Sequence, residues 1–247
     1  MRVDQREKSN YSALKRPEHL SLADIAYKVL LEAILKQEFE PGAQISIDNM
    51  AKQLHMSNTP VREALMRANG ERLVRQKTNH GFVVADVLTP LELRHLFSIR
   101  YMLEVNGLQS ADLTGSIDDE LKELGRLVEQ MVHATDGAVY DDYKDYLLLD
   151  HEFHRILVKL SGNTFLIKAW EDLHVHLHLS RLYTGIGLFD RHDSSTEHKE
   201  ILDALRQRDA GQAADLLGQH ISRVQMHVEA IREREKLKQR DTESTDN

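Results

Sequence analysis

The sequence predicts a mainly α-helical protein in two parts: a small N-terminal domain of three helices and a β-hairpin, and a larger C-terminal, all-α bundle of antiparallel helices. Three observations support this fold class. Apolar residues recur at helical spacing through most of the chain, two short β-rich runs occur only between residues 73 and 85, and Thr89-Pro90 follows the second run. The expected parts are a flexible arm at 1–19, a first domain at 20–88, a helical domain at 89–235 and a disordered tail at 236–247.

Composition agrees with two ordinary globular domains. The 247 residues are 41% hydrophobic and 29% charged, and they include no Cys, so disulfides and thiolate metal sites are excluded. No run of 18 apolar residues occurs, so neither a membrane span nor a signal peptide is expected, and a cytoplasmic protein is the default. The net charge of −8 lies in the second part, because residues 20–87 carry eight basic and eight acidic side chains.

The first domain shows the order of elements of a winged helix-turn-helix. Ser21 stands three residues before Asp24, as in an N-cap, and Ile25 and Val29 follow at helical spacing. The expected elements are helices at 21–37, after Ser46 and at 59–69, and strands at 73–76 and 82–85.

Here the chain resembles a known family. The stretch from Pro41 to Leu65, above all Thr59-Pro-Val-Arg-Glu-Ala-Leu65, closely resembles the DNA-binding domain of the GntR family. The resemblance implies a homodimer that binds a double-stranded DNA operator with a short inverted repeat. One departure concerns Arg72, which stands before the hairpin where Gly is usual, at a position that requires positive φ.

The DNA contacts that we expect lie on the second helix of the motif and on the wing. Arg62 is placed for a bidentate contact to guanine, and its alternative is a local ion pair with Glu63 or Asp48. For Arg67 a solvated surface is an equal alternative. The expected DNA-binding residues are Ser57, Asn58, Thr59, Arg62, Arg67, His80 and Gly81.

The helical domain places polar residues on faces that are expected to be buried. Asp150 and His154 are four residues apart within one apolar stripe, and His198 and His220 lie in the stripes of two later helices. A buried Asp is costly unless it is paired or binds a metal. One Asp and three His suit Zn²⁺, Ni²⁺ or Mn²⁺, and ordinary core histidines are the alternative.

Other histidines are weaker candidates. His151 falls off the stripe and is expected to be exposed. His174, His176 and His178 form a rival cluster without an acidic partner on the same face, so we favour packing or effector contact for them.

The second part also resembles a family domain. Asp150-His-Glu-Phe-His154, Glu197-His198 and His220 resemble the FCD ligand-binding domain of the FadR-type GntR subfamily. The resemblance implies Asp150, His154, His198 and His220 as metal ligands and Arg100 and Arg181 as contacts of a small organic or sugar acid effector. An ion pair with Glu104 is the alternative for Arg100.

The function predicted from these resemblances is a ligand-responsive transcription regulator, usually a repressor in this family, and not an enzyme. A metal-dependent hydrolase or lyase that uses the Asp/His cluster is one alternative. Against it, four protein ligands leave fewer open positions than the three of a typical catalytic zinc site. A metal-binding domain with no effector is the other alternative.

Overall fold

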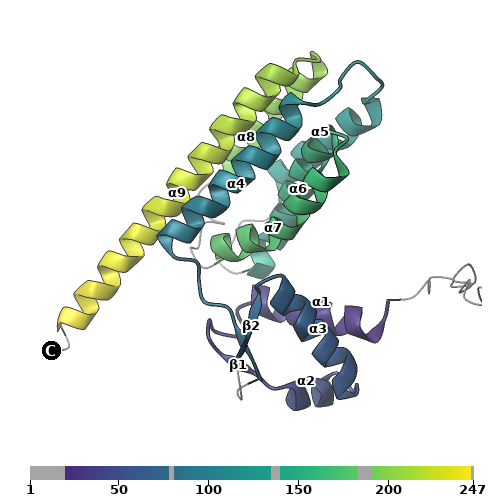
Figure 1. Cartoon of the computed structure of the whole chain (residues 1–247). Helices are drawn as coiled ribbons and strands as arrows, with labels where there is room; N and C mark the ends of the chain where they lie inside the picture. Colours follow the sequence, from purple (N-terminus) through teal and green to yellow (C-terminus); the bar gives the residue numbers. More distant parts are fainter. Residues whose placement is uncertain (1–19, 78–80, 135–139, 183–190, 246–247) are drawn as a thin grey trace, which may run out of the picture. The chain divides into compact units, whose positions relative to one another are not determined.

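The computed structural model describes residues 20–77, 81–134, 140–182 and 191–245 (Figure 1). The chain forms two compact units: residues up to Glu32 with Gln44–Val83, and Ala33–Ala43 with Val84 onward. The division thus falls a few residues before the expected boundary at 88. Residues 33–43 group with the second unit, where Val84 donates to the carbonyl of Ala43 and accepts from the amide of Gly42.

The predicted helices and hairpin of the first part are present. The elements are α1 (Leu22–Leu35), β1 (Gln44–Ile45), α2 (Ile47–Gln53), α3 (Asn58–Gly70), β2 (Val74–Lys77) and β3 (Gly81–Val84). The strand order is β1-β3-β2, and β1, which the sequence did not predict, pairs antiparallel with β3 through Gln44 opposite Val83 and Ile45 opposite Phe82.

Caps explain where these helices begin. Ser21 and Asp24 bond reciprocally, and the Ser21 hydroxyl accepts from the amide of Asp24 at 3.1 Å. The Ser46 side chain caps α2 by accepting from the amide of Asn49. Each cap satisfies an amide that has no partner within its helix, so both helix starts follow from local sequence.

The turn after α3 has the backbone that the sequence predicts. Arg72 has a φ of 60°, its amide donates to Asn69, and the amide of Leu73 donates to Ala68. These two bonds close α3 in a Schellman motif, whose left-handed residue is usually Gly. Arg72 therefore holds a conformation that costs a non-glycine residue about 1 kcal/mol.

Helical spacing alone does not identify the buried face of α1. Ala26 and Leu30 are buried, whereas Ile25 and Val29 are 37% and 40% exposed. The stripe at spacing four that marks the helix is therefore not its buried side.

The second unit is a helical bundle, as predicted. Its helices are α4 (Pro90–Gln109), α5 (Asp118–His133), α6 (Tyr140–Lys159), α7 (Thr164–Leu182), α8 (Arg191–Arg206) and α9 (Ala210–Thr245). Helix α4 packs against α9, α7 and α6, and α8 packs against α9 and α5 (Figure 1). A reciprocal capping box between Thr89 and Glu92 starts α4 directly after the domain boundary. None of the described helices is long and apolar enough to cross a lipid bilayer.

Helix α9 extends further than predicted. It continues to Thr245, through residues that the sequence analysis assigned to a disordered tail at 236–247. The added segment includes Lys236, Lys238, Gln239 and Arg240. Long, unbranched polar side chains are good helix formers, so a polar composition without an apolar stripe does not by itself end a helix.

Candidate functional site

The first candidate site is the exposed N-terminal half of α3. Ser57, the N-cap residue, makes no side-chain capping bond, and Asn58, Thr59 and Arg62 are exposed. Val61 and Leu65 are fully buried on the opposite side of the helix. The first turn of α3 thus presents polar side chains and backbone amides to solvent, an arrangement suited to phosphates and base edges.

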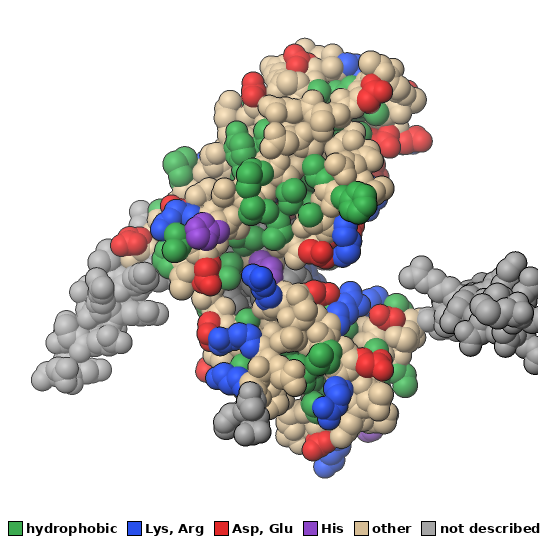
Figure 2. Space-filling view, viewed as in Figure 1, with side chains coloured by type: hydrophobic (Ala, Val, Ile, Leu, Met, Phe, Trp, Pro, Cys, Tyr) green, Lys and Arg blue, Asp and Glu red, His purple; other side chains and the backbone are tan. Residues whose placement is uncertain are grey.

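The local ion pair weighed for Arg62 is not formed. Asp48 instead accepts a hydrogen bond from Nδ2 of Asn58 at 2.6 Å. Within the described part of the chain, no hydrogen bond or ion pair of Arg62 is found. Figure 2 shows Lys and Arg side chains spread over the visible face of the N-terminal unit, with some Asp and Glu among them.

Arg67 is held by contacts within its own domain. Its guanidinium lies 3.8 Å from the centre of the Tyr27 ring, and it pairs with Glu71 at 3.1 Å and Asp24 at 3.5 Å. The hydroxyl of Tyr27 donates to Glu71, and burial, this bond and the charge of Glu71 raise the pKa of Tyr27 above its usual range. The network ties α1 to the end of α3.

The wing is described in part. Gly81 begins β3 with a φ of 72°, a conformation that glycine adopts without steric cost. His80 lies outside the described residues.

The second candidate site is a buried cluster of four side chains from three helices. Asp150 and His154 come from α6, His198 from α8 and His220 from α9. All four are buried, and one ligand atom from each lies within 4.8 Å of the others. The centroids of the three imidazole rings are 4.7 to 5.2 Å apart. The structure thus brings together the set that the sequence analysis selected.

The donor set fits a divalent ion. A carboxylate and three imidazoles are ligands that Zn²⁺, Ni²⁺ and Mn²⁺ accept. Oδ1 of Asp150 lies 3.7 Å from Nε2 of His154 and 3.6 Å from Nε2 of His198. These distances exceed a hydrogen bond, and they suit oxygen and nitrogen atoms that would share one ion.

Two further carboxylates contact the outer nitrogens of this cluster. Nδ1 of His154 lies 2.8 Å from Glu104, and Nδ1 of His220 lies 2.7 Å from Glu197. Burial alone would raise the pKa of Glu104, but Arg100 and His154 outweigh it and hold that pKa well below its usual range. Glu104 is therefore a carboxylate, which can only accept hydrogen bonds.

Arg100 forms the ion pair that was weighed as the alternative to effector contact. Its Nε donates to Glu104 at 2.8 Å, and both side chains are almost fully buried. Its Nη2 lies 3.0 Å from Nε2 and 3.3 Å from Nδ1 of His154. Nη2 is thus close to both ring nitrogens of His154 and slightly closer to Nε2. Arg100 is thus beside the cluster.

The structure describes the side chains of only some of the remaining histidine and arginine candidates. His151 is not exposed as predicted: it is half-buried and stacks on Trp170 with centroids 5.1 Å apart, and burial lowers its pKa to about 4. His176 is half-buried in α7. The side chains of His174, His178 and Arg181 lie outside the described part.

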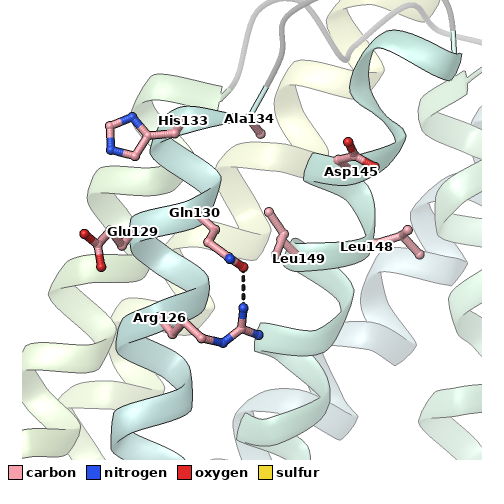
Figure 3. A pocket seen from close by; sticks show the side chains of 8 residues that line it. All are labelled: Arg126, Glu129, Gln130, His133, Ala134, Asp145, Leu148 and Leu149. Carbon is pink, nitrogen blue, oxygen red and sulfur yellow. Dashed lines mark hydrogen bonds between the residues drawn. The ribbon is translucent and has the colours of Figure 1, made fainter.

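A surface hollow between α5 and α6 is separate from the cluster (Figure 3). Its lining mixes charged and apolar side chains, and Arg126 donates to Gln130 within it. It includes none of the four clustered residues. The lining residues are Arg126, Glu129, Gln130, His133, Ala134, Asp145, Leu148 and Leu149.

Three residues that the sequence analysis did not select lie at or beside the two candidate sites. Met66 is 50% exposed on α3, one turn after Arg62, where an apolar side chain suits a thymine methyl. The sequence analysis named Glu197 only as part of a motif, and Glu104 only as a possible partner of Arg100. An exposed apolar residue on a polar face is a signal for Met66. The contacts of both glutamates depend on packing between distant helices.

Comparisons with known proteins cover both sites. The family described as "FCD domain" matches residues 95–223, and "Bacterial regulatory proteins, gntR family" matches residues 22–84. The Nta operon transcriptional regulator of Aminobacter aminovorans is 32% identical over 196 residues, covering 79% of this chain and 87% of that protein. The gluconate operon transcriptional repressor of Bacillus subtilis is 22% identical, covering 84% of each. The structure of Escherichia coli McbR/YncC aligns with a TM-score of 0.71 at 23% identity, over 85% of this chain and 98% of that one.

Proposed function

The chain belongs to the gntR family of bacterial regulatory proteins and carries an FCD domain, and from this premise we propose that it is a repressor whose C-terminal unit binds a divalent metal and a small carboxylate. Its family consists of DNA-binding transcription regulators and not enzymes, and repressors occur among its relatives. The alternative of a metal-dependent hydrolase or lyase is therefore set aside. The observation that carries the proposal is the buried Asp150, His154, His198 and His220 cluster in a chain with a helix-turn-helix unit.

The proposed DNA contacts follow from exposure on α3 and at the wing. Ser57, Asn58 and Thr59 would meet phosphates or base edges at the start of the helix, and Arg62 would reach into the major groove. Gly81, with His80 before it, would let the wing approach the backbone of the minor groove. We assign Arg67 to holding α1 against α3, because its guanidinium is already bound there. A homodimer would place two such helices on an inverted repeat.

The Arg62→Ala variant tests the proposed DNA contact of α3. We expect operator affinity to fall by about 1–3 kcal/mol, roughly 5- to 150-fold, with relaxed specificity at one base pair of each half-site. The operator would first be selected from random or genomic DNA, and fluorescence anisotropy at fixed salt would give the affinities. Arg94→Ala removes the same charge from an exposed position on α4 and is the control. The assignment of Arg62 to DNA would be contradicted if the selection returned no inverted repeat. It would also be contradicted if Arg62→Ala and Arg94→Ala lost the same affinity.

The proposed metal site uses the four clustered residues as ligands of one Zn²⁺, Ni²⁺ or Mn²⁺ ion. When bound, the ion would supply a positive charge that attracts an anionic ligand. Four protein ligands on a six-coordinate ion leave two positions, which a carboxylate or a hydroxy acid can take.

The effector proposed for this site is a small organic or sugar acid. Arg100 lies beside the cluster and carries a planar guanidinium that suits a carboxylate. Ser195, one turn before His198 on α8, is buried, and its hydroxyl makes no hydrogen bond within the described structure. A buried hydroxyl in that state is costly, so a ligand group or a water there would be stabilising. The relative named for the gluconate operon agrees with an acid of this class. Arg181 remains a second proposed contact.

A further inference from the structure

We propose that Glu197 and Glu104 are positioning residues of the metal site: each holds one ligand histidine with its proton on Nδ1 and its lone pair on Nε2. The inference rests on the proposed metal site, because it assigns a role toward that metal. It adds two residues that are not ligands themselves. Both reach the cluster through an outer imidazole nitrogen.

The contact of Glu197 with His220 joins two helices. Glu197 comes from α8 and His220 from α9, and Oε2 of Glu197 lies 2.7 Å from Nδ1 of His220. His220 is completely buried, while the Glu197 side chain is 24% exposed. A carboxylate has no proton to give, so Nδ1 must donate. In a neutral imidazole, the form that binds a metal, Nε2 is then the nitrogen that carries the lone pair.

Arg223 fixes the carboxylate in turn. Its Nη2 donates to Oε2 of Glu197 at 2.6 Å and to the hydroxyl of Ser194 at 3.1 Å, and its Nε donates to Oε1 of Glu197. Two guanidinium nitrogens on one carboxylate define the direction of that group as well as its position. A single surface ion pair would hold its carboxylate less firmly.

The contact of Glu104 with His154 repeats the arrangement with other helices. Oε2 of Glu104, on α4, lies 2.8 Å from Nδ1 of His154. Oε1 accepts from Nε of Arg100 at 2.8 Å and from Nε1 of Trp170 at 2.7 Å. Each group of three therefore contains an arginine, a glutamate and a histidine, and in this group Nη2 of Arg100 also lies 3.0 Å from Nε2 of His154.

A carboxylate on the outer nitrogen of a ligand histidine has one chemical consequence. A histidine binds a metal through a nitrogen without a proton, and a carboxylate on the other nitrogen fixes that tautomer and raises the basicity of the ligand. Two of the three histidines in the cluster have a carboxylate on their outer nitrogen, and the two glutamates that supply it are far apart in the chain. An ordinary buried histidine also needs an acceptor for its N–H, but a backbone carbonyl on either nitrogen serves that purpose equally well.

Zinc affinity in the Glu197→Gln variant tests the inference. The amide of Gln can accept from Nδ1–H or donate to a bare Nδ1, so it no longer selects one tautomer. We expect Zn²⁺ binding by the full-length protein to weaken about 10- to 100-fold, measured by competition with a chromophoric chelator. Glu200→Gln removes the same charge from an exposed position on α8 and should leave the affinity unchanged.

The tautomer itself supplies a second readout, which does not depend on bound metal. In metal-free protein labelled with ¹⁵N-histidine, two-bond ¹H–¹⁵N correlation spectra distinguish Nδ1–H from Nε2–H imidazoles. His220 in the wild type is expected to be the Nδ1–H form, identified by the signal that is lost in His220→Asn. Glu197→Gln should give a mixture of both forms. A merely structural role for Glu197 would leave this signal unchanged.

The outcomes separate this inference from the proposed function. Wild-type protein that binds no Zn²⁺ removes the metal site and the inference together. Wild-type protein that binds one Zn²⁺, with unchanged affinity in Glu197→Gln, overturns the inference alone. An Nε2–H tautomer of His220 in the metal-free wild type also overturns it, even if Glu197→Gln fails to fold.

Discussion

Replacing Arg100 by Met is expected to destabilise the protein by about 3–5 kcal/mol, because the change leaves Glu104 buried without its cation. Both side chains are almost fully buried, so water cannot replace the lost ion pair. Met keeps much of the length and volume of Arg, which limits the effect of a cavity. The free energy of unfolding would be measured by urea denaturation in the presence of a chelator, so that metal occupancy does not contribute.

Two further variants isolate the buried charge as the cause. Arg155→Met breaks a half-exposed ion pair with Glu152 and should cost at most about 1 kcal/mol. The double variant Arg100→Met with Glu104→Gln removes the orphaned charge and should recover a large part of the stability. If the double variant is no more stable than Arg100→Met, the loss comes from packing and the electrostatic explanation is wrong.

The second large effect concerns the metal. Loading the protein with Zn²⁺ should stabilise it by about 4 kcal/mol when free metal is 1,000-fold above its Kd, because a ligand that binds only the folded state stabilises that state. Excess chelator should lower the Tm accordingly. His198→Ala should abolish this response, because His198 supplies one of the four clustered ligand atoms.

Differential scanning fluorimetry with and without chelator makes the comparison, together with elemental analysis of protein purified without chelator. His227→Ala, in the half-buried part of α9 outside the cluster, should keep the response of the wild type. Absence of metal in the wild type, with no stability change in His198→Ala, would show that these are ordinary core histidines.

Local signals were sufficient to predict most elements of the fold. Ser21, Ser46 and Thr89 mark helix starts through short-range capping bonds, and the positive φ at Arg72 follows from its place between α3 and the hairpin. The four clustered residues were found because each one interrupts an apolar stripe at helical spacing. Such signals lie within one helix and need no knowledge of its neighbours.

What the sequence could not supply depends on contacts between helices. The partners of Glu104 and Glu197 lie 50 and 23 residues away along the chain, on other helices. The contacts of Arg67 could not be predicted for the same reason, because Tyr27 and Asp24, which hold its side chain, lie on α1. The buried side of α1 has a related cause: spacing identifies a helix, but packing partners decide which of two apolar stripes is covered.

A ligand-responsive repressor must bind its operator differently when its C-terminal site is occupied. The most direct test measures operator affinity of Zn²⁺-loaded protein by fluorescence anisotropy, with and without saturating gluconate or a related hydroxy acid, while calorimetry confirms that the acid binds. A change of at least tenfold, equivalent to about 1.4 kcal/mol of coupling, is the predicted result. An acid that binds tightly and leaves operator affinity the same would contradict the claim.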